Sequence, residues 1–312
     1  MGRSVTVHVL DQTTGERLTP PDVMLYRIGV PGENRAESNQ DGSFSFTDLS
    51  QGEYSLAVYD PRYAPLHEHF ALMPQDSKVL ELHLTPGGFL SGQVLDEEGQ
   101  PPERCWFTLL RSGARRGKSG YIDDSGDHQV SKDGKFCSLP LRPARYFLRM
   151  AGLLRRPAVV DPFQGPPSIE KRYFDFLYPN AHDLADAIGF NIAVGEVISG
   201  LQVRIPRPVP HTVRGKVIGD LPEQRAHISV MFAREIGTID PVGGASGSTV
   251  QADGTFECAV LPGRYSIEVC EFSPPEPDGR THMLRRFGKA KINVPEADLD
   301  GVEVQISSED LA

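Results

Sequence analysis

The segment Asp41-Gly42-Ser43-Phe44 opens a pattern that occurs three times in this chain of 312 residues. It recurs as DGKF at 133–136 and as DGTF at 253–256. In each copy an aliphatic residue follows five positions after the Phe. A Gly-x-Tyr or Ala-x-Tyr triplet comes next, at 52–54, 144–146 and 263–265. An internal repeat of this kind indicates an array of similar structural units.

The residues of the repeat are typical of turns and strands. Asp-Gly favours a tight turn because glycine tolerates positive φ. Phe44 and Phe46 share one face at the strand period of two. One unit is therefore predicted to be an antiparallel pair of strands with one buried face. We expect six aromatic side chains of the repeat in the core: Phe44, Tyr54, Phe136, Tyr146, Phe256 and Tyr265.

Three further strands flank each copy. The opening strands are expected at 5–9, 92–96 and 215–219, the second strands at 23–27, 107–111 and 230–234, and the closing strands at 79–84, 200–205 and 301–306. Short strands at regular spacing between turn signals favour β-sandwiches. Proline-rich joints at 85–88 and 206–210 separate the copies.

The fold class is therefore all-β, with three tandem Ig-like or prealbumin-like antiparallel β-sandwiches. The domains are expected at 1–86, 87–208 and 209–312. The second domain carries insertions, at 112–132 and 153–192. The stretch 180–189 has an Asn that can cap a helix, Leu184 and Ile188 on one face, and a terminal Gly. It predicts one short helix in the second domain.

Composition excludes some classes of partner. The chain has 32 Lys and Arg against 42 Asp and Glu, a formal net charge of −10. Because phosphate binding requires a basic surface, we expect no nucleic-acid partner. No apolar run approaches the roughly 20 residues of a membrane span. The first residues lack the apolar core of a signal peptide, so none is expected in this chain.

The repeat resembles a known domain family. Gly92, Val94, Asp96, Gly99 and Pro101 form a G-x-V-x-D…G-x-P opening that precedes the D-G-x-F…G-x-Y unit. Together they resemble the carboxypeptidase regulatory-like domain, a transthyretin-like sandwich related to Cna-B domains. The resemblance covers nearly the whole chain as three copies, although the first and third depart from the opening pattern.

This resemblance implies a bacterial protein with a non-catalytic accessory, adhesive or carbohydrate-binding role. It also implies a location outside the cell or in the cell envelope. The expected function is therefore extracytoplasmic binding or scaffolding, with a glycan or protein partner. One alternative is a pure structural spacer, and another is a metal-dependent enzyme with its site at a domain interface.

The enzyme alternative depends on His67 and His69, which alternate on one strand face with Glu68 between them. No third ligand is nearby in sequence. The acidic run at 123–127 offers oxygens for calcium but lacks the spacing of an EF-hand. We therefore predict no catalytic residue, no metal site and no cofactor.

The four cysteines show no C-x-x-C spacing. Cys258 shares the inward face of Phe256, whereas Cys137 and Cys270 each follow an inward residue and should point outward. Free thiols are therefore expected, and the cellular compartment stays open.

The expected binding surface lies on the second domain and includes Trp106, Tyr121, Tyr173 and Tyr178. The columns 23/107/230 and 25/109/232 are apolar in all three copies, which places Trp106, the single Trp, on the opposite face. Exposed aromatic side chains can stack on sugars or anchor a protein. The alternative is that Trp106 packs against a neighbouring domain or the Tyr178 segment. The ligand and the oligomeric state are not predicted.

Overall fold

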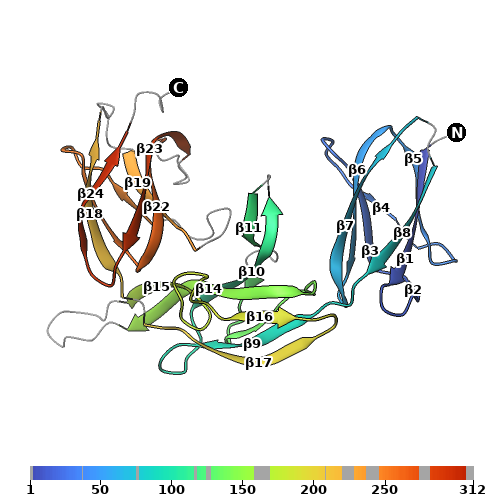
Figure 1. Cartoon of the computed structure of the whole chain (residues 1–312), viewed down its shortest axis with the longest axis horizontal. Helices are drawn as coiled ribbons and strands as arrows, with labels where there is room; N and C mark the ends of the chain where they lie inside the picture. The colour runs from blue at the N-terminus through green and yellow to red at the C-terminus, as the bar shows by residue number, and fades with distance from the viewer. Residues whose placement is uncertain are drawn as a thin grey trace. The chain divides into compact units, whose positions relative to one another are not determined.

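The computed structural model describes residues 3–36, 38–74, 77–115, 118–123, 128–157, 169–207, 209–219, 228–236, 246–273 and 282–306. These residues form strands, turns and loops, and none of them is helical (Figure 1). The predicted all-β class is confirmed. No helix among the described residues is long and apolar enough to span a membrane.

The first repeat contains two sheets. Its strands are β1 (Arg3–Asp11), β2 (Arg17–Leu18), β3 (Asp22–Arg27), β4 (Asn34–Arg35), β5 (Phe44–Leu49), β6 (Gly52–Asp60), β7 (Tyr63–Leu72) and β8 (Ser77–Leu84). One sheet has the order β2-β1-β5 with β8 also on β1, and the other has the order β4-β3-β6-β7. Side chains of both sheets form one buried cluster, with Val7 and Leu25 fully buried. The first repeat is thus two sheets around one core.

The second repeat has the same two kinds of sheet, enlarged. Its strands are β9 (Phe89–Leu95), β10 (Arg104–Arg115), β11 (Lys118–Asp123), β12 (His128–Gln129), β13 (Lys135–Cys137), β14 (Ala144–Pro157), β15 (Ile169–Leu177), β16 (Gly189–Ile192) and β17 (Val197–Arg204). The small sheet is β13-β9-β17. The large one is β11-β10-β14-β15, with β12 paired to β10 and β16 paired to β14.

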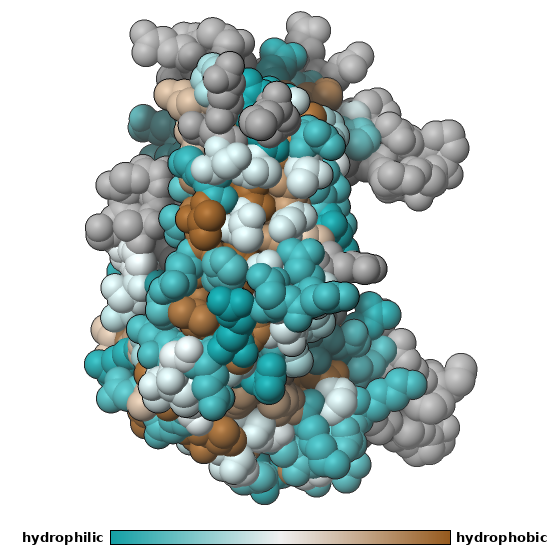
Figure 2. Space-filling view, turned by 90° about the vertical axis from the view of Figure 1, so that its right-hand side faces the viewer, coloured by the Kyte–Doolittle hydropathy of each residue, from teal (hydrophilic) through white to brown (hydrophobic). Residues whose placement is uncertain are grey.

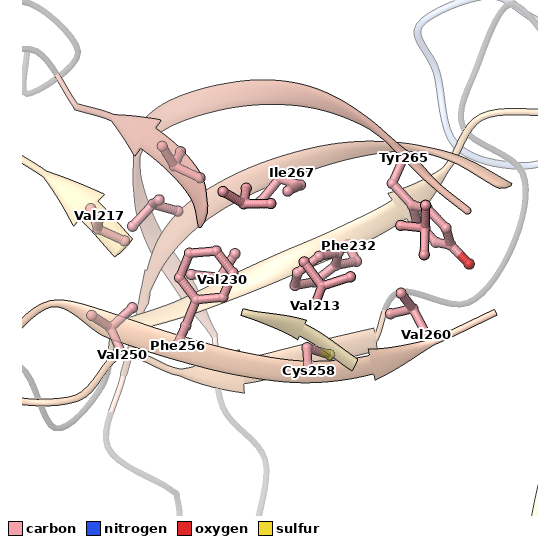
Figure 3. Close-up of a cluster of buried hydrophobic side chains, with 14 of the residues drawn as sticks. Val213, Val217, Val230, Phe232, Val250, Phe256, Cys258, Val260, Tyr265 and Ile267 are labelled. Carbon is pink, nitrogen blue, oxygen red and sulfur yellow. The ribbon is translucent and has the colours of Figure 1, made fainter. Parts of the chain in front are cut away.

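The third repeat returns to the simpler plan. Its strands are β18 (His211–Ile218), β19 (Ile228–Arg234), β20 (Ser246–Thr249), β21 (Thr255–Val260), β22 (Gly263–Phe272), β23 (Met283–Val294) and β24 (Leu299–Gln305). The sheets are β21-β18-β24 and β20-β19-β22-β23. Figure 3 shows their shared core, where Phe232, Phe256 and Ile267 meet between the sheets.

The conformation and the burial of the repeat motif agree with the prediction, both at its turn and in the core. Gly42, Gly134 and Gly254 have φ of 76°, 79° and 86°, the left-handed region that glycine tolerates. The six predicted aromatic residues are all at most 5% exposed. The expected turns and core positions are therefore confirmed.

The predicted pairing within one unit is wrong. The D-G-x-F strand and the Gly-x-Tyr strand do not pair with each other, because they belong to opposite sheets in every copy. In the first copy β5 pairs with β1, whereas β6 pairs with β3 and β7. Gly52 begins β6 at φ 155°, and the Tyr54 hydroxyl donates to the Ser50 carbonyl at 2.8 Å. The motif therefore carries the chain from one sheet to the other.

The expectation of purely antiparallel sheets also needs correction. Opening strand β1 and closing strand β8 run parallel, as do β18 and β24. Antiparallel pairs include β3 with β6 and β19 with β22. The closing strand enters the sheet of the opening strand after a crossover from the other sheet. It therefore runs in the same direction as the opening strand.

The short helix predicted at 180–189 is absent. Ala181 exchanges both backbone hydrogen bonds with Leu177, and the Ile188 N–H donates to the Tyr178 carbonyl at 2.9 Å. These contacts close the segment into a loop. The Asp183 carboxylate accepts from the Ala185 N–H, which stabilises a single turn. Local cap signals were present, but these contacts with the end of β15 determine the conformation.

By its internal contacts the chain divides into two compact units. One contains Met1–Gln93, Cys137–Arg145 and Phe190–Leu201, and the other contains Val94–Phe136, Tyr146–Gly189 and Gln202–Ala312. The division into domains at 1–86, 87–208 and 209–312 remains a prediction.

Candidate functional site: a buried ionic joint

The large sheet of the second repeat is buried on its outer face as well as its inner face. Leu109 and Leu148 are fully buried on the inner side, and their neighbours Leu110 and Phe147 are also at most 3% exposed. Leu110 and Phe147 belong to a separate apolar cluster. Its other members are Leu177, Ala181, Leu184 and, from the third repeat, Ile236. The outer face therefore packs on the Tyr178 loop and on the third repeat.

Three charged side chains are buried beside this cluster. Arg149 of β14 and Asp175 of β15 form a bidentate pair, Nε–Oδ1 2.9 Å and Nη2–Oδ2 2.8 Å. Arg234 of β19 lies 3.6 Å from the same carboxylate and donates to the Asp175 carbonyl. The three side chains are only 2%, 5% and 3% exposed. Two guanidinium groups from different repeats thus share one carboxylate away from water.

His182 completes the group. Arg234 Nη2 lies 2.7 Å from His182 Nδ1 and 3.2 Å from the Pro262 carbonyl. Since arginine only donates, Nδ1 accepts and the imidazole proton is on Nε2. Burial, with the positive charge of Arg234, lowers the pKa of His182. The imidazole is therefore neutral at pH 7. We call Arg149, Asp175, His182 and Arg234, with the apolar cluster, the 2–3 joint.

The rim of the 2–3 joint is polar. Arg264 of β22 forms an ion pair with Asp183, and these side chains are 52% and 26% exposed. A cleft of about 340 Å³ opens beside His182. Its walls include Phe174, Asn180, Arg207, His211 and Glu296. A second, more open hollow shares His182 and Pro262 with this cleft.

The predicted binding residues lie on or near this outer face, but they do not converge on one point. Trp106 is half-buried and pairs with Ala151 and Gln129. Tyr121 is half-buried and contacts Phe147 edge-on, with ring centroids 5.3 Å apart. Since Tyr121 pairs with Ser112, six positions along β10 from Trp106, roughly 20 Å separates them.

The remaining two predicted residues are placed as follows. Tyr173 pairs with Leu153 in β15, and its side chain lies outside the described residues. Tyr178 is half-buried directly after β15, and its N–H donates to the Leu148 carbonyl. Binding at Trp106, Tyr121, Tyr173 and Tyr178 therefore stays a prediction.

The histidines of the enzyme alternative are on an exposed strand. His67 and His69 lie in β7, and the Tyr59 hydroxyl is 3.4 Å from His67 Nε2. Burial and nearby Arg142 lower the pKa of His67. Among the described residues, no cluster of three His, Cys, Asp or Glu side chains is arranged to hold a metal. The acidic run at 123–127 lies outside the residues whose side chains are described.

All four cysteines are free, as expected. Cys258 is in the core and Cys137 is exposed, as predicted. Cys270 was expected to point outward like Cys137, but it is only 1% exposed, so its thiol does not reach solvent. Cys270 is nevertheless not a member of the core cluster, and β22 stays in register with β19 there, because the irregularity beside Cys270 places its extra residue in β23.

The exposed surface offers no single dominant apolar patch in the view of Figure 2, where brown residues are interspersed with teal ones. Exposed large apolar residues occur in all three repeats, among them Val30, Leu139 and Leu284. Isolated apolar residues on a surface are ordinary.

Comparison with known proteins gives no family. No family model matches the chain, and no curated protein matches it. Among solved structures, it is similar to the TIE protein of Bacillus anthracis, with 14% identity and a TM-score of 0.26. This match covers 98% of the chain and 51% of the other, so the chain spans about half of that protein.

Two further solved structures are similar at the same level. The major pilin subunit of Bacillus cereus matches over 98% of this chain and 100% of its own, with 9% identity and a TM-score of 0.24. A candidate carbohydrate-binding protein of Bacteroides uniformis matches over 55% and 99%, with 10% identity and a TM-score of 0.23. Such low scores carry no argument about function, and the resemblance to carboxypeptidase regulatory-like domains remains a prediction.

Proposed function

We propose that the chain is a non-catalytic scaffold of three tandem β-sandwich domains, in which the second and third repeats hold a binding surface on a fixed support. The observation that carries this proposal is the 2–3 joint, where Arg149, Asp175 and Arg234 are buried together. A protein that acts only as a spacer would need no buried charges between its second and third repeats.

The joint favours one geometry because of the way its charges are satisfied. The bidentate Arg149–Asp175 pair has strict distance and angle requirements, and Arg234 reaches the same carboxylate from the third repeat. A displacement of a few ångströms would leave buried charges without partners. Removing one partner of such a pair typically costs about 3–5 kcal/mol. Orientations other than the observed one are therefore strongly disfavoured.

The link that leaves the first repeat is also tied down. The Gly87 N–H donates to the Arg62 carbonyl at 2.9 Å, and Arg142 donates to the Pro65 carbonyl at 2.6 Å. A Cβ on Gly87 would lie 2.4 Å from Pro140 Cβ. The proline-rich segment at 85–88 is thus packed against Arg62 on one side and Pro140 on the other, within one compact unit.

The location and the partner rest on the sequence resemblance. Carboxypeptidase regulatory-like domains imply an extracytoplasmic protein with a glycan or protein ligand. The half-buried Trp106 of the second repeat is the proposed contact residue, because Tyr121 already packs on Phe147. A stacking surface of this kind needs a fixed support, which the 2–3 joint provides.

Native-state hydrogen exchange tests the proposal. If the second and third repeats act as one body, amides of β14, β15 and β19 open with the same free energy. An Asp175→Asn variant should lower the protection of all three strands together. Independent protection of β19, unaffected by Asp175→Asn, would contradict the scaffold.

A further inference from the structure

The buried guanidinium of Arg234 has no carboxylate of its own among the described residues. Its nearest carboxylate, at 3.6 Å, belongs to Asp175, which Arg149 already holds through two hydrogen bonds. The described acceptors of its hydrogen bonds are all neutral: the Asp175 and Pro262 carbonyls and His182 Nδ1. Its Nε has no acceptor in the described part of the chain. A positive charge that is only 3% exposed is therefore balanced mainly by dipoles and a shared carboxylate.

His182 connects this buried charge to the cleft of about 340 Å³. The imidazole lines the cleft, and because Nδ1 accepts from Arg234 its proton is on Nε2. No described residue accepts from this Nε2–H. An anion that accepts from Nε2–H polarises the ring and makes Nδ1 a stronger acceptor for Arg234. The imidazole can thus pass the effect of a bound negative charge on to the buried guanidinium.

Further donors lie in the wall of the same cleft. Arg207 is exposed, lines the cleft from the segment between β17 and β18, and forms no ion pair with any described residue. Asn180 adds an exposed amide from the loop after β15. A guanidinium presents paired N–H groups that match the two oxygens of a carboxylate. Together with the Nε2–H of His182, these donors favour an anionic ligand.

The rest of the wall decides which anion fits. Burial and Arg234 lower the pKa of His182, and the nearby carboxylate of Glu296, itself in the wall, acts in the opposite direction. This fixed negative charge repels a dianion more strongly than a monoanion. Apolar residues make up much of the remaining wall: Pro206, Val209, Leu261 and Pro262. A volume of about 340 Å³ has room for roughly ten water-sized groups, at the small end of ligand sites.

We propose that the cleft beside His182 binds an organic monocarboxylate with a compact apolar body. The carboxylate accepts from Arg207 and from the Nε2–H of His182, and the apolar body lies along Val209 and Leu261. The inference goes beyond the proposed scaffold, because it assigns a ligand to the 2–3 joint that the scaffold does not require. A bound carboxylate supplies negative charge beside Arg234, so it should strengthen the contact between the second and third repeats.

Benzoate and its neutral isostere benzamide are the probes. The imidazole resonances of the full chain are followed by NMR at pH 7.5, and those of His182 are assigned by their loss in His182→Gln. Benzoate should shift the His182 resonances saturably, with a Kd of roughly 1–10 mM for a ligand of this size. Benzamide should bind at least about tenfold more weakly, since it carries no charge. No saturable shift with benzoate, or equal binding of benzamide, overturns the proposal.

Variants of the wall test the assigned contacts. Arg207→Gln should weaken benzoate at least about tenfold, because it removes the charged partner of the carboxylate. The matched control is Lys216→Gln, which removes the same charge from an exposed position of β18 outside the cleft and should bind benzoate like the parent. Glu296→Gln should tighten benzoate several-fold, since a negative charge leaves the wall. Equal losses in Arg207→Gln and Lys216→Gln, or weaker binding in Glu296→Gln, would contradict the assigned site.

Inorganic phosphate tests the selectivity of the cleft. At matched ionic strength, millimolar phosphate should leave the binding of benzoate unchanged, and displacement of benzoate would overturn the assignment to a monocarboxylate.

Hydrogen exchange separates this inference from the scaffold. Saturating benzoate should raise the protection of β15 and β19 together. If benzoate does not bind while β14, β15 and β19 still open with one free energy, this inference is refuted and the scaffold stands.

Discussion

Replacing Asp175 by Ala removes the one carboxylate shared by Arg149 and Arg234. Both guanidinium groups, only 2% and 3% exposed in the parent chain, then lose the carboxylate that they share. Removing one partner of a buried ion pair costs about 3–5 kcal/mol. At about 2–4 °C per kcal/mol for a unit of this size, the melting temperature should fall by roughly 6–20 °C.

Thermal unfolding followed by circular dichroism measures this change. The matched control is Glu257→Ala, which breaks the exposed Arg214–Glu257 pair at 2.8 Å. Because both groups of that pair face solvent, the control should leave the melting temperature within experimental error. A comparable loss in the control would point to general destabilisation by surface charge changes.

A compensated variant separates the ionic joint from simple loss of packing. In Arg149→Met/Asp175→Leu/Arg234→Met, apolar side chains replace the buried charges, and such replacements are often neutral or stabilising. We expect this variant to recover most of the melting temperature lost in Asp175→Ala. If Asp175→Ala melts like the parent chain, the carboxylate does not hold the joint and the reasoning is refuted.

Four further outcomes follow from the same structure. The pKa of His182 is lowered from 6.5 in the folded chain, so the unfolded state binds more protons and the free energy of unfolding should fall as the pH drops below about 6.5. Urea unfolding at pH 7.5 and 5.5 measures this loss, which should be smaller in His182→Gln. Gly263→Ala places a Cβ at φ 139° and 3.2 Å from Arg234 Nε, and should lower the free energy of unfolding by about 1–3 kcal/mol. With iodoacetamide, Cys137 should react in the folded chain, whereas Cys105, whose pKa burial raises to about 12, should react only after unfolding; mass spectrometry locates the label. A glycan that binds at Trp106 should shift the fluorescence of this single Trp, and a glycan array without any such response argues against that surface.

Much of the fold can be predicted from the sequence because the repeat signals are local. Asp-Gly pairs require tight turns, and Gly42, Gly134 and Gly254 all have positive φ. The alternation of apolar residues identifies the buried columns, and Phe107 and Leu109 are at most 1% exposed. These features depend only on neighbours in the chain, which a sequence displays directly.

The pairing between strands is harder to predict from the sequence. The pattern of each repeat unit predicts one pair of strands, yet the two strands belong to opposite sheets in all three copies, including the second, where Ala144 stands in place of the glycine. The segment at 180–189 has helix start and stop signals, but contacts with Leu177 and Tyr178 hold it as a loop. In both cases contacts outside the local pattern decide the outcome.

The sequence contains only weak signals of the 2–3 joint. Leu109-Leu110 and Phe147-Leu148 break strict alternation, which indicates a sheet buried on both faces. Asp175 stands between Phe174 and Phe176, each 1% exposed, where a solvated carboxylate is unexpected. Its partners Arg149 and Arg234 are 26 and 59 residues away, so no local pattern pairs them.

The orientation of the second repeat relative to the third tests the central claim most directly. In a Cys137→Ser background, spin labels at Lys132→Cys and Lys216→Cys, both exposed positions in the parent, report this distance by pulsed electron resonance. A rigid 2–3 joint predicts one narrow distance distribution, which broadens when Asp175 is replaced by Ala. A broad distribution in the parent chain, unchanged by that replacement, would contradict the scaffold.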